Sequence, residues 1–181
     1  MGRVRAALDE AATRFIQEQR VFFVASAPLD ANGHVNLSPK GLDTFRILGP
    51  TSVAYLDFNG SGVETIAHLQ ENGRIVLMFC AFQGPPNVLR LHGHGRTVKA
   101  HESEFGPLAS HFPAYENPRS IILVEVTRVT DSCGYGVPLF KYEGEREQLS
   151  AWARKKGPEG LRAYRREKNR RSVDGLPGLA E

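Results

Sequence analysis

The sequence predicts a mainly β protein in which an antiparallel barrel carries helices at its edges. Its 181 residues are the length of one domain, and 41% hydrophobic residues are enough for a sizeable core. About six segments have the composition of strands and are joined by short turns. Few helices lie between those segments, so the chain lacks the alternation of strand and helix that a parallel sheet requires.

The first element is an amphipathic helix over about residues 4–19, whose apolar residues recur at helical spacing. Acidic residues and glutamines stand in it where a signal peptide would have an apolar stretch. No segment approaches the roughly 18 to 20 consecutive apolar residues of a membrane span. We therefore expect a cytoplasmic protein that has no membrane partner.

A strand over residues 21–27 and a return strand over 34–38 are predicted to form a hairpin around a turn rich in proline, aspartate and glycine. Side chains alternate along a strand, so Val35 and Leu37 share one face. We expect that face to lie on the local core. The opposite face then carries a polar row that points away from the core, made of His34, Asn36 and Ser38.

The central stretch of the chain runs from Val53 to Phe79. It predicts a strand, a glycine-rich turn, a helix that ends at Asn72-Gly73, and a second strand. A glycine-rich turn that opens a helix directs backbone N–H groups and the positive end of the helix dipole at whatever lies in front of it. The turn over residues 59–62 is therefore a candidate anion site. An ordinary strand–turn–helix connection has the same local pattern, so this site needs support from elsewhere in the chain.

Further elements complete the predicted fold. The glycines at positions 93 and 95 permit a bend or a close approach in a long strand. The last residues carry specific turn chemistry and apolar side chains, so we expect the tail to pack on the protein. In order, these elements are a short strand over 43–48, a long strand over 88–98, a short helix or loop over 102–112, a strand over 119–130, helices over 145–156 and 158–168, and the tail over 172–177.

Positive charge is concentrated near the end of the chain. Residues 154–171 contain nine Lys or Arg and two Glu, which gives +7, and since the whole chain is +3 the remainder is −4. Such a run is a solvated face or binds an acidic surface of a second subunit, a substrate phosphate, or nucleic acid. Nucleic acid is the least favoured of these, because no strand face combines basic and aromatic residues.

The cysteines and histidines do not predict a metal site. Cys80 and Cys133 have neither a metal-ligand spacing nor a disulfide pattern, and we expect each to be a small buried side chain. His92 and His94 share one face of a strand and could bind a metal or haem, but the sequence places no third ligand beside them.

Several motifs occur in one order along the chain: NLSPKG, GSGVETIAHLQENGRI, the RLHG strand, DSCGYGVP, and a closing segment from WARKKG to SVDGLP. As an ensemble they resemble the pyridoxamine 5′-phosphate oxidase-like FMN-binding family. The resemblance implies a split β-barrel and a homodimer that holds FMN at its interface. It implies a single domain over 1–181, made of an N-terminal helix (1–20), the barrel (21–131), and a flavin-covering loop with the C-terminal helices and tail (132–181).

The resemblance also implies where the flavin lies. The strand that ends at Lys40 would line the ring, and Lys40 would face its polar edge. The strand through Tyr55 to Asp57 would follow the ribityl chain, the glycine-rich turn would approach the phosphate, and a loop would cover the ring from the second subunit. The implied cofactor-binding residues are Asn36, Ser38, Pro39, Lys40, Gly41, Tyr55, Asp57, Ser61, Gly62, Thr65, Arg74, Arg90 and Tyr135.

The chain departs from the oxidase at important positions. Glu64-Thr65 stands where the oxidase has an Arg-Lys pair for the phosphate, so we expect Arg74 or Arg90 to supply the cation. The oxidase residues that grip pyridoxal phosphate have no counterpart in SVDGLPG. We therefore expect an FMN-dependent oxidoreductase with a small-molecule substrate other than that of the oxidase, and we assign no catalytic residue. The alternative is a non-catalytic protein of the same fold that binds flavin, deazaflavin or haem.

Overall fold

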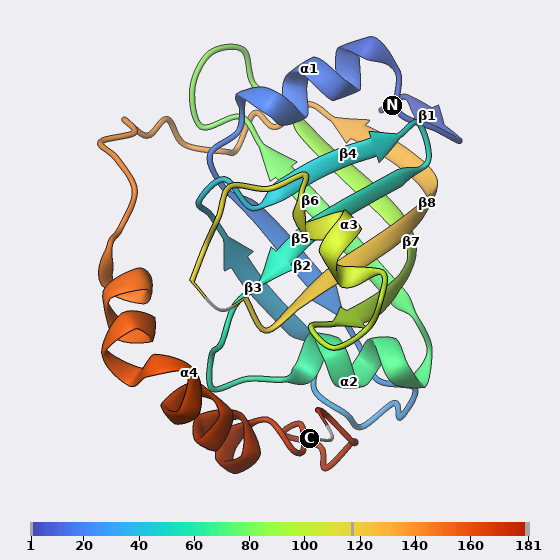
Figure 1. Ribbon diagram of the computed structural model, residues 1–181. Coiled ribbons are helices and arrows are strands. Elements are labelled where there is room, and N and C mark those ends of the chain that lie inside the picture. The colour runs from blue at the N-terminus through green and yellow to red at the C-terminus, as the bar shows by residue number, and fades with distance from the viewer. Residues whose placement is uncertain (1, 117, 180–181) are drawn as a thin grey trace.

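Eight strands form one antiparallel sheet that curls into a split barrel (Figure 1). The structure is a computed structural model and describes residues 2–116 and 118–179. The sheet runs in the order β3-β2-β6-β7-β8-β5-β4, and β1 pairs with β8. The strands are β1 Val4–Arg5, β2 Phe22–Ser26, β3 Asn36–Lys40, β4 Phe45–Gly49, β5 Ser52–Asp57, β6 Arg74–Cys80, β7 Val88–Lys99 and β8 Ser120–Ser132.

The two longest strands, β7 and β8, let the sheet fold back on itself. Residues Ser120 to Glu125 of β8 pair with β5, and Val129 and Thr130 pair with β1, while β7 pairs with β8 along its whole length. The β7–β8 register shifts between His92 and Gly93, as a β-bulge does. A Cβ on Gly93 would lie 2.1 Å from the Glu125 carbonyl oxygen, so only glycine fits. The bend predicted from this glycine is confirmed.

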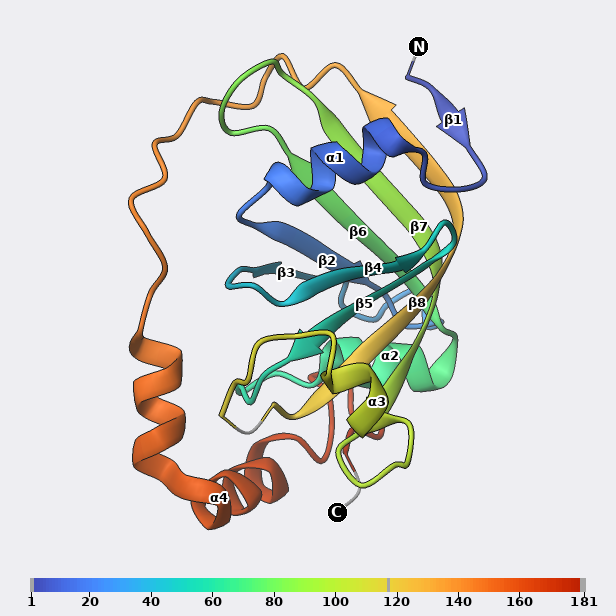
Figure 2. The same ribbon diagram turned by 45° about the horizontal axis from the view of Figure 1, so that its top comes forward.

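Two helices cover the ends of the barrel, and a third, near the end of the chain, lies outside it. Figures 1 and 2 show α1 and α2 at opposite ends of the barrel, with α4 outside it. The core between α1 and α2 contains an aromatic cluster of Phe22, Phe45, Tyr55 and Phe79, with ring centroids 5.0–5.6 Å apart. The helices are α1 Glu10–Glu18, α2 Glu64–Glu71, α3 Phe105–Ala109 and α4 Gln148–Lys168.

The N-terminal helix is shorter than predicted. It begins after Asp9, whose side chain accepts a hydrogen bond from the Ala12 N–H as an N-cap. Val4 and Arg5 form β1, and the Arg5 guanidinium bonds both oxygens of Asp131 at 2.7 and 2.8 Å. A good N-cap and a strand pairing with β8 therefore replace the first turns of the predicted helix.

The prediction for the faces of β3 was wrong. Val35 and Leu37 are 73% and 63% exposed, while Asn36 points inward. The Asn36 amide donates to Thr65 Oγ1 at 2.9 Å and to Ser26 Oγ at 3.2 Å. Because polar groups of α2 and β2 supply these partners, Asn36 faces the interior and the apolar pair faces outward, while His34 is exposed.

The C-terminal region confirms the predicted pair of helices and the packed tail. The backbone of α4 is non-helical at Gly157, with φ 65°, which separates two helical segments. In the tail, Leu179 is buried, and Asp174 accepts hydrogen bonds from the backbone N–H and ring Nδ1 of His34. That carboxylate raises the pKa of His34, since it stabilises the imidazolium.

The expectation for the cysteines is half right. Cys80 is buried, and burial raises the pKa of its thiol. Cys133 is exposed, because it lies at the start of a long coil over residues 133–147. We call this coil the strap. Figure 2 shows it running down one side of the barrel from the end of β8 to α4.

Candidate functional site

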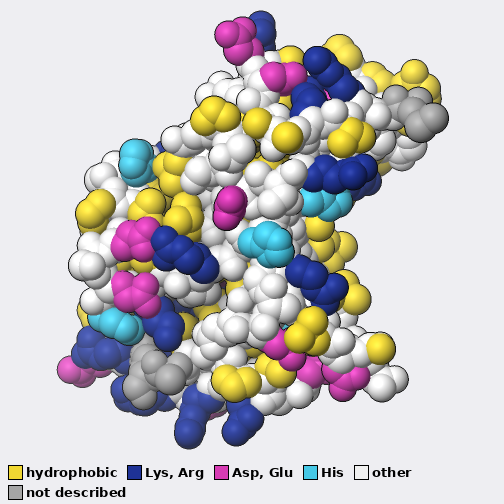
Figure 3. Space-filling view, turned by 90° about the vertical axis from the view of Figure 1, so that its right-hand side faces the viewer, with side chains coloured by type: hydrophobic (Ala, Val, Ile, Leu, Met, Phe, Trp, Pro, Cys, Tyr) yellow, Lys and Arg dark blue, Asp and Glu magenta, His cyan; other side chains and the backbone are white. Residues whose placement is uncertain are grey.

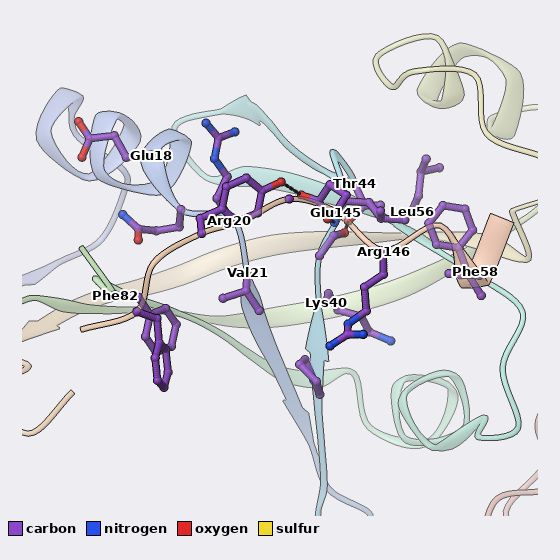
Figure 4. Close-up of a pocket in the computed structure, with 18 of the residues that line it drawn as sticks. Glu18, Arg20, Val21, Lys40, Thr44, Leu56, Phe58, Phe82, Glu145 and Arg146 are labelled. Atoms are coloured by element: carbon purple, nitrogen blue, oxygen red, sulfur yellow. Dashed lines mark hydrogen bonds between the residues drawn. The ribbon is translucent and has the colours of Figure 1, made fainter. Parts of the chain in front are cut away.

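A cavity of about 920 Å³ lies between the barrel and the strap (Figure 4). The end of β3, the end of β5 with the turn after it, and the loop after β6 form its barrel walls. The strap and the start of α4 form the remaining wall. A cavity of about 300–1,000 Å³ is typical of sites for cofactors and small molecules.

Aromatic side chains line both ends of this cavity. Phe82 and Phe140 are stacked with ring centroids 5.3 Å apart, and the Phe140 N–H donates to the Phe82 carbonyl at 2.9 Å. Phe58 lies toward the other end in Figure 4, with Leu56 nearby. Apolar and aromatic walls with a few polar groups suit a planar conjugated ring.

Glu145 fastens the strap to the barrel. Its carboxylate accepts hydrogen bonds from the Tyr142 hydroxyl at 2.8 Å and from the Leu42 N–H at 3.3 Å. The bond to Glu145 raises the pKa of Tyr142. The Arg20 guanidinium lies 5.5 Å from the centroid of the Tyr142 ring, a cation–π contact.

Leu42 carries backbone strain at the rim of the cavity. Its φ is 60°, and it is the only non-glycine residue with a positive φ in the described part of the chain. A branched side chain in this region costs of order 1–3 kcal/mol and persists where the surrounding structure enforces it. Strain of this kind occurs at binding sites, which agrees with the position of Leu42 on the cavity wall.

A buried ionic network supports the cavity from behind. Lys40, which lines the cavity, has its Nζ 3.9 Å from Asp57 Oδ1. Asp57 Oδ2 accepts from Arg119 Nε at 2.8 Å and from the Ser120 hydroxyl at 3.2 Å. Asp57 and Arg119 are 2% and 8% exposed. Two cations share one carboxylate here, so the network leaves one positive charge beside the cavity.

The same network fixes the glycine-rich turn after β5. Arg119 Nη1 donates to the Gly62 carbonyl at 2.8 Å and to Asn169 Oδ1 at 3.0 Å. The Asn169 amide, which is fully buried, donates to the Gly60 carbonyl at 2.9 Å. Arg119 and Asn169, the C-cap residue of α4, therefore hold the turn in place through its carbonyl groups.

The start of α2 is only partly suited to an anion. Its N-cap residue, Val63, provides no side-chain hydrogen bond, so backbone N–H groups there have no side-chain cap. The Glu64 side chain folds over this end, since a Cβ on Gly62 would lie 2.4 Å from Glu64 Oε2. This carboxylate opposes an anion at that position unless a cation balances it.

The structure brings three of the predicted cofactor residues to the cavity: Pro39, Lys40 and Gly41. Asp57 lies directly behind Lys40. Tyr55 is fully buried in the barrel core, and burial raises the pKa of its hydroxyl. Strand alternation explains this placement, because Leu56 and Phe58 line the cavity in place of Tyr55 and Asp57.

The other predicted residues lie outside the cavity wall. Arg74 donates to the Pro28 carbonyl at 3.0 Å, and Arg90 donates to the Ser132 hydroxyl at 3.2 Å. Tyr135 is 81% exposed on the strap. Ser61 and Gly62 are exposed beside the cavity, while Ser38 is half-buried on β3 and Asn36 and Thr65 bond each other.

Sequence reasoning missed much of the cavity. The residues that line it and were not predicted include Arg20, Phe58, Phe82 and, on the strap, Phe140, Lys141, Tyr142, Gly144, Glu145 and Arg146. The strap sequence FKYEGER offers a weak signal, because aromatic and charged residues alternate in a segment that predicts neither helix nor strand. Nothing in it indicates which part of the barrel it covers.

Comparison with known proteins assigns the chain to a family. Residues 8–133 match the sequence model of the family described as pyridoxamine 5′-phosphate oxidase. The chain belongs to the pyridoxamine 5′-phosphate oxidase family. A pyridoxamine 5′-phosphate oxidase family protein of Aspergillus flavus, ustO, is 37% identical over an alignment 178 residues long, and the match covers 89% of this chain and 71% of ustO.

Solved structures confirm the fold of this family member. HupZ of Group A Streptococcus has a TM-score of 0.55 at 18% identity, over 74% of this chain and 99% of HupZ. A Lactobacillus delbrueckii protein named provisionally as a pyridoxamine 5′-phosphate oxidase has a TM-score of 0.53 at 16% identity, over 69% of this chain and 94% of its own.

Two features are absent from the described residues. No helix in them is long and apolar enough to cross a membrane. No group of three or more His, Cys, Asp or Glu side chains in them could hold a metal ion.

Proposed function

We propose that this protein is a cytoplasmic FMN-dependent oxidoreductase that acts on a small molecule. The observation that carries the proposal is the cavity between barrel and strap, which combines aromatic walls with a cation, Lys40, at the end of β3. Membership of the pyridoxamine 5′-phosphate oxidase family supports it, as does a volume within the range of cofactor sites.

The residues around the cavity fit a flavin. The side chains of Leu56, Phe58 and Phe82 would cover the faces of the ring and exclude water. Lys40 would stabilise negative charge on the polar edge of the ring, since Asp57 is shared with Arg119 and neutralises Lys40 only in part. Bound FMN would itself supply hydride or electron transfer.

The co-purifying small molecule tests this function. We expect the purified protein to be yellow and to release FMN on denaturation, as identified by mass spectrometry. Reduction of the bound flavin by NAD(P)H, followed by turnover of an added acceptor, would separate an oxidoreductase from a non-catalytic flavin carrier. A colourless protein that takes up no added FMN would contradict the proposal. Release of a deazaflavin or haem would show that this molecule, and not FMN, is the cofactor.

We expect the glycine-rich turn to contact the phosphate of FMN. Replacing Ser61 and Thr65 together with alanine should then weaken FMN binding by about tenfold, the effect of losing hydrogen bonds to a charged group. Quenching of flavin fluorescence measures the dissociation constant. Thr13→Ala on α1, at the other end of the barrel, is the control. Unchanged affinity in the double variant would place the phosphate elsewhere.

We infer that the protein forms a homodimer through the outer face of its sheet. Val35 and Leu37 lie on this face, and the half-buried Phe23 lies beside them on β2. Figure 3 shows that one side of the molecule is hollowed, with hydrophobic, histidine and basic side chains along the hollow. An apolar sheet face of this kind is typical of a protein interface.

Leu37→Arg should convert the dimer to a monomer, because it places a charge on an apolar surface that would be buried on association. Light scattering after size-exclusion chromatography gives the mass. Leu29→Arg is the matched control, since Leu29 is also 63% exposed but lies in the β2–β3 turn. If wild-type protein is a monomer, or if both variants stay dimeric, the outer face is not the interface.

A further inference from the structure

The cavity between barrel and strap carries more positive than negative charge. Arg20, Lys40, Lys141 and Arg146 line it, against Glu18 and Glu145, a net charge of +2. Glu145 is already engaged, since it accepts hydrogen bonds from Tyr142 and Leu42. The excess charge is therefore available to a ligand.

Arg146 stands out among these cations. No carboxylate lies within 4.0 Å of its guanidinium in the described residues, and it makes no hydrogen bond or cation–π contact with them. It comes from the strap, while Lys40 comes from β3, and Figure 4 shows both side chains projecting into the same part of the cavity. Two segments separated by about a hundred residues thus each direct a cation to this region.

Such an arrangement favours an anion between the two cations. Asp57 neutralises Lys40 only in part. Its Oδ1 lies 3.9 Å from Lys40 Nζ, while its Oδ2 pairs with Arg119 Nε at 2.8 Å. Two like charges repel each other in a cavity with apolar walls, where screening by water is reduced. An arginine fork and a lysine ammonium together match the oxygens of a carboxylate or phosphate.

We propose that Arg146 and Lys40 form an anion-binding site within the cavity, which takes a phosphate or carboxylate group. This proposal rests on the proposed function, in that the cavity is the flavin site. If the anion is an acidic group of the substrate, the flavin placement proposed above holds, with the ring edge near Lys40 and the phosphate at the glycine-rich turn. If the anion is the phosphate of FMN, the flavin lies the other way round in the cavity, with its phosphate between Lys40 and Arg146. In both cases an anion held by the two cations links the strap to β3, because Arg146 lies on the strap and Lys40 on β3.

Titrations with FMN and with riboflavin, which lacks the phosphate, distinguish the two sources. If the anion is the FMN phosphate, Arg146→Met should weaken FMN binding by about tenfold to a hundredfold and leave riboflavin binding unchanged. If the anion belongs to the substrate, Arg146→Met should leave FMN binding unchanged. Inorganic phosphate should then perturb the flavin absorbance of the FMN-loaded wild type and require a concentration at least about tenfold higher in the variant.

A measurement without flavin separates this proposal from the proposed function. Inorganic phosphate should slow proteolysis of the strap in the wild type and in Arg166→Met, a control that removes one exposed charge from α4. It should not do so in Arg146→Met. Equal protection of all three proteins, together with unchanged FMN and phosphate binding in Arg146→Met, would overturn the anion site. Protection that depends on Arg146 in a protein that binds no flavin would support the site and overturn only the FMN function.

Discussion

Replacing Arg119 with methionine should lower the free energy of unfolding by about 3–5 kcal/mol, the cost of leaving a buried carboxylate without its partner. Asp57 is 2% exposed and depends on Arg119, with Lys40 at 3.9 Å too far for a strong hydrogen bond. The substitution also removes the hydrogen bonds from Arg119 to Gly62 and Asn169. We therefore expect the glycine-rich turn and the tail to loosen together.

Urea unfolding of wild type, Arg119→Met and the double variant Asp57→Asn, Arg119→Met measures this effect. The double variant should regain part of the lost stability, because it no longer buries an unpaired charge. Arg128→Met on the exposed face of β8 is the control and should change stability by less than about 0.5 kcal/mol. A loss under about 1 kcal/mol in Arg119→Met would show that water or Lys40 compensates Asp57 fully.

Replacing Gly60 with tryptophan should abolish most FMN binding while the protein stays folded. Gly60 lines the cavity, its φ is not positive, and a Cβ on it would meet no atom within 4 Å. The indole would therefore fit without backbone strain and would occupy space that the ring or ribityl chain needs. We expect the dissociation constant of FMN to rise by about a hundredfold or more, which is about 2.7 kcal/mol.

Gly106→Trp is the matched control for this substitution. Gly106 lies in α3 and also has open space around its Cβ. Circular dichroism and thermal unfolding should be similar for both variants and the wild type, so that a loss of binding in Gly60→Trp reports on the cavity. Wild-type affinity for FMN in a folded Gly60→Trp protein would mean that the flavin binds elsewhere.

Local patterns predicted most of the fold correctly. The glycine-rich turn, the helix that ends at Gly73 and the long strand with a bend at Gly93 all occur where the sequence places them, because turn residues, caps and β-rich segments act over a few positions. The extent of the first helix was wrong because strand pairing with β8 and a cap at Asp9 compete with helix propensity.

The faces of β3 could not be predicted from alternation alone. A strand of five residues has a polar and an apolar side, and which side faces inward depends on what the neighbouring elements offer. Here Thr65, 29 residues away from Asn36, provides a hydrogen-bond acceptor inside the barrel. The apolar side is left exposed, which alternation along a single strand does not reveal.

The candidate site was predicted in part for a similar reason. Lys40 and the turn near Gly60 are found together because β3 and β5 end at the same cavity. The strap residues that line the cavity come from 80 or more residues further along the chain than Gly60, and Asn169 lies 109 residues after it. Such long-range contacts depend on the path of an irregular segment, and composition and spacing do not encode that path.

Hydrogen exchange with and without FMN tests the central claim most directly, namely that the flavin lies between the barrel and the strap. We expect FMN to slow amide exchange at the ends of β3 and β5 and along the strap from Phe140 to Arg146, with little change on α3, which does not line the cavity. Protection confined to other surfaces, or none at saturating FMN, would contradict the account.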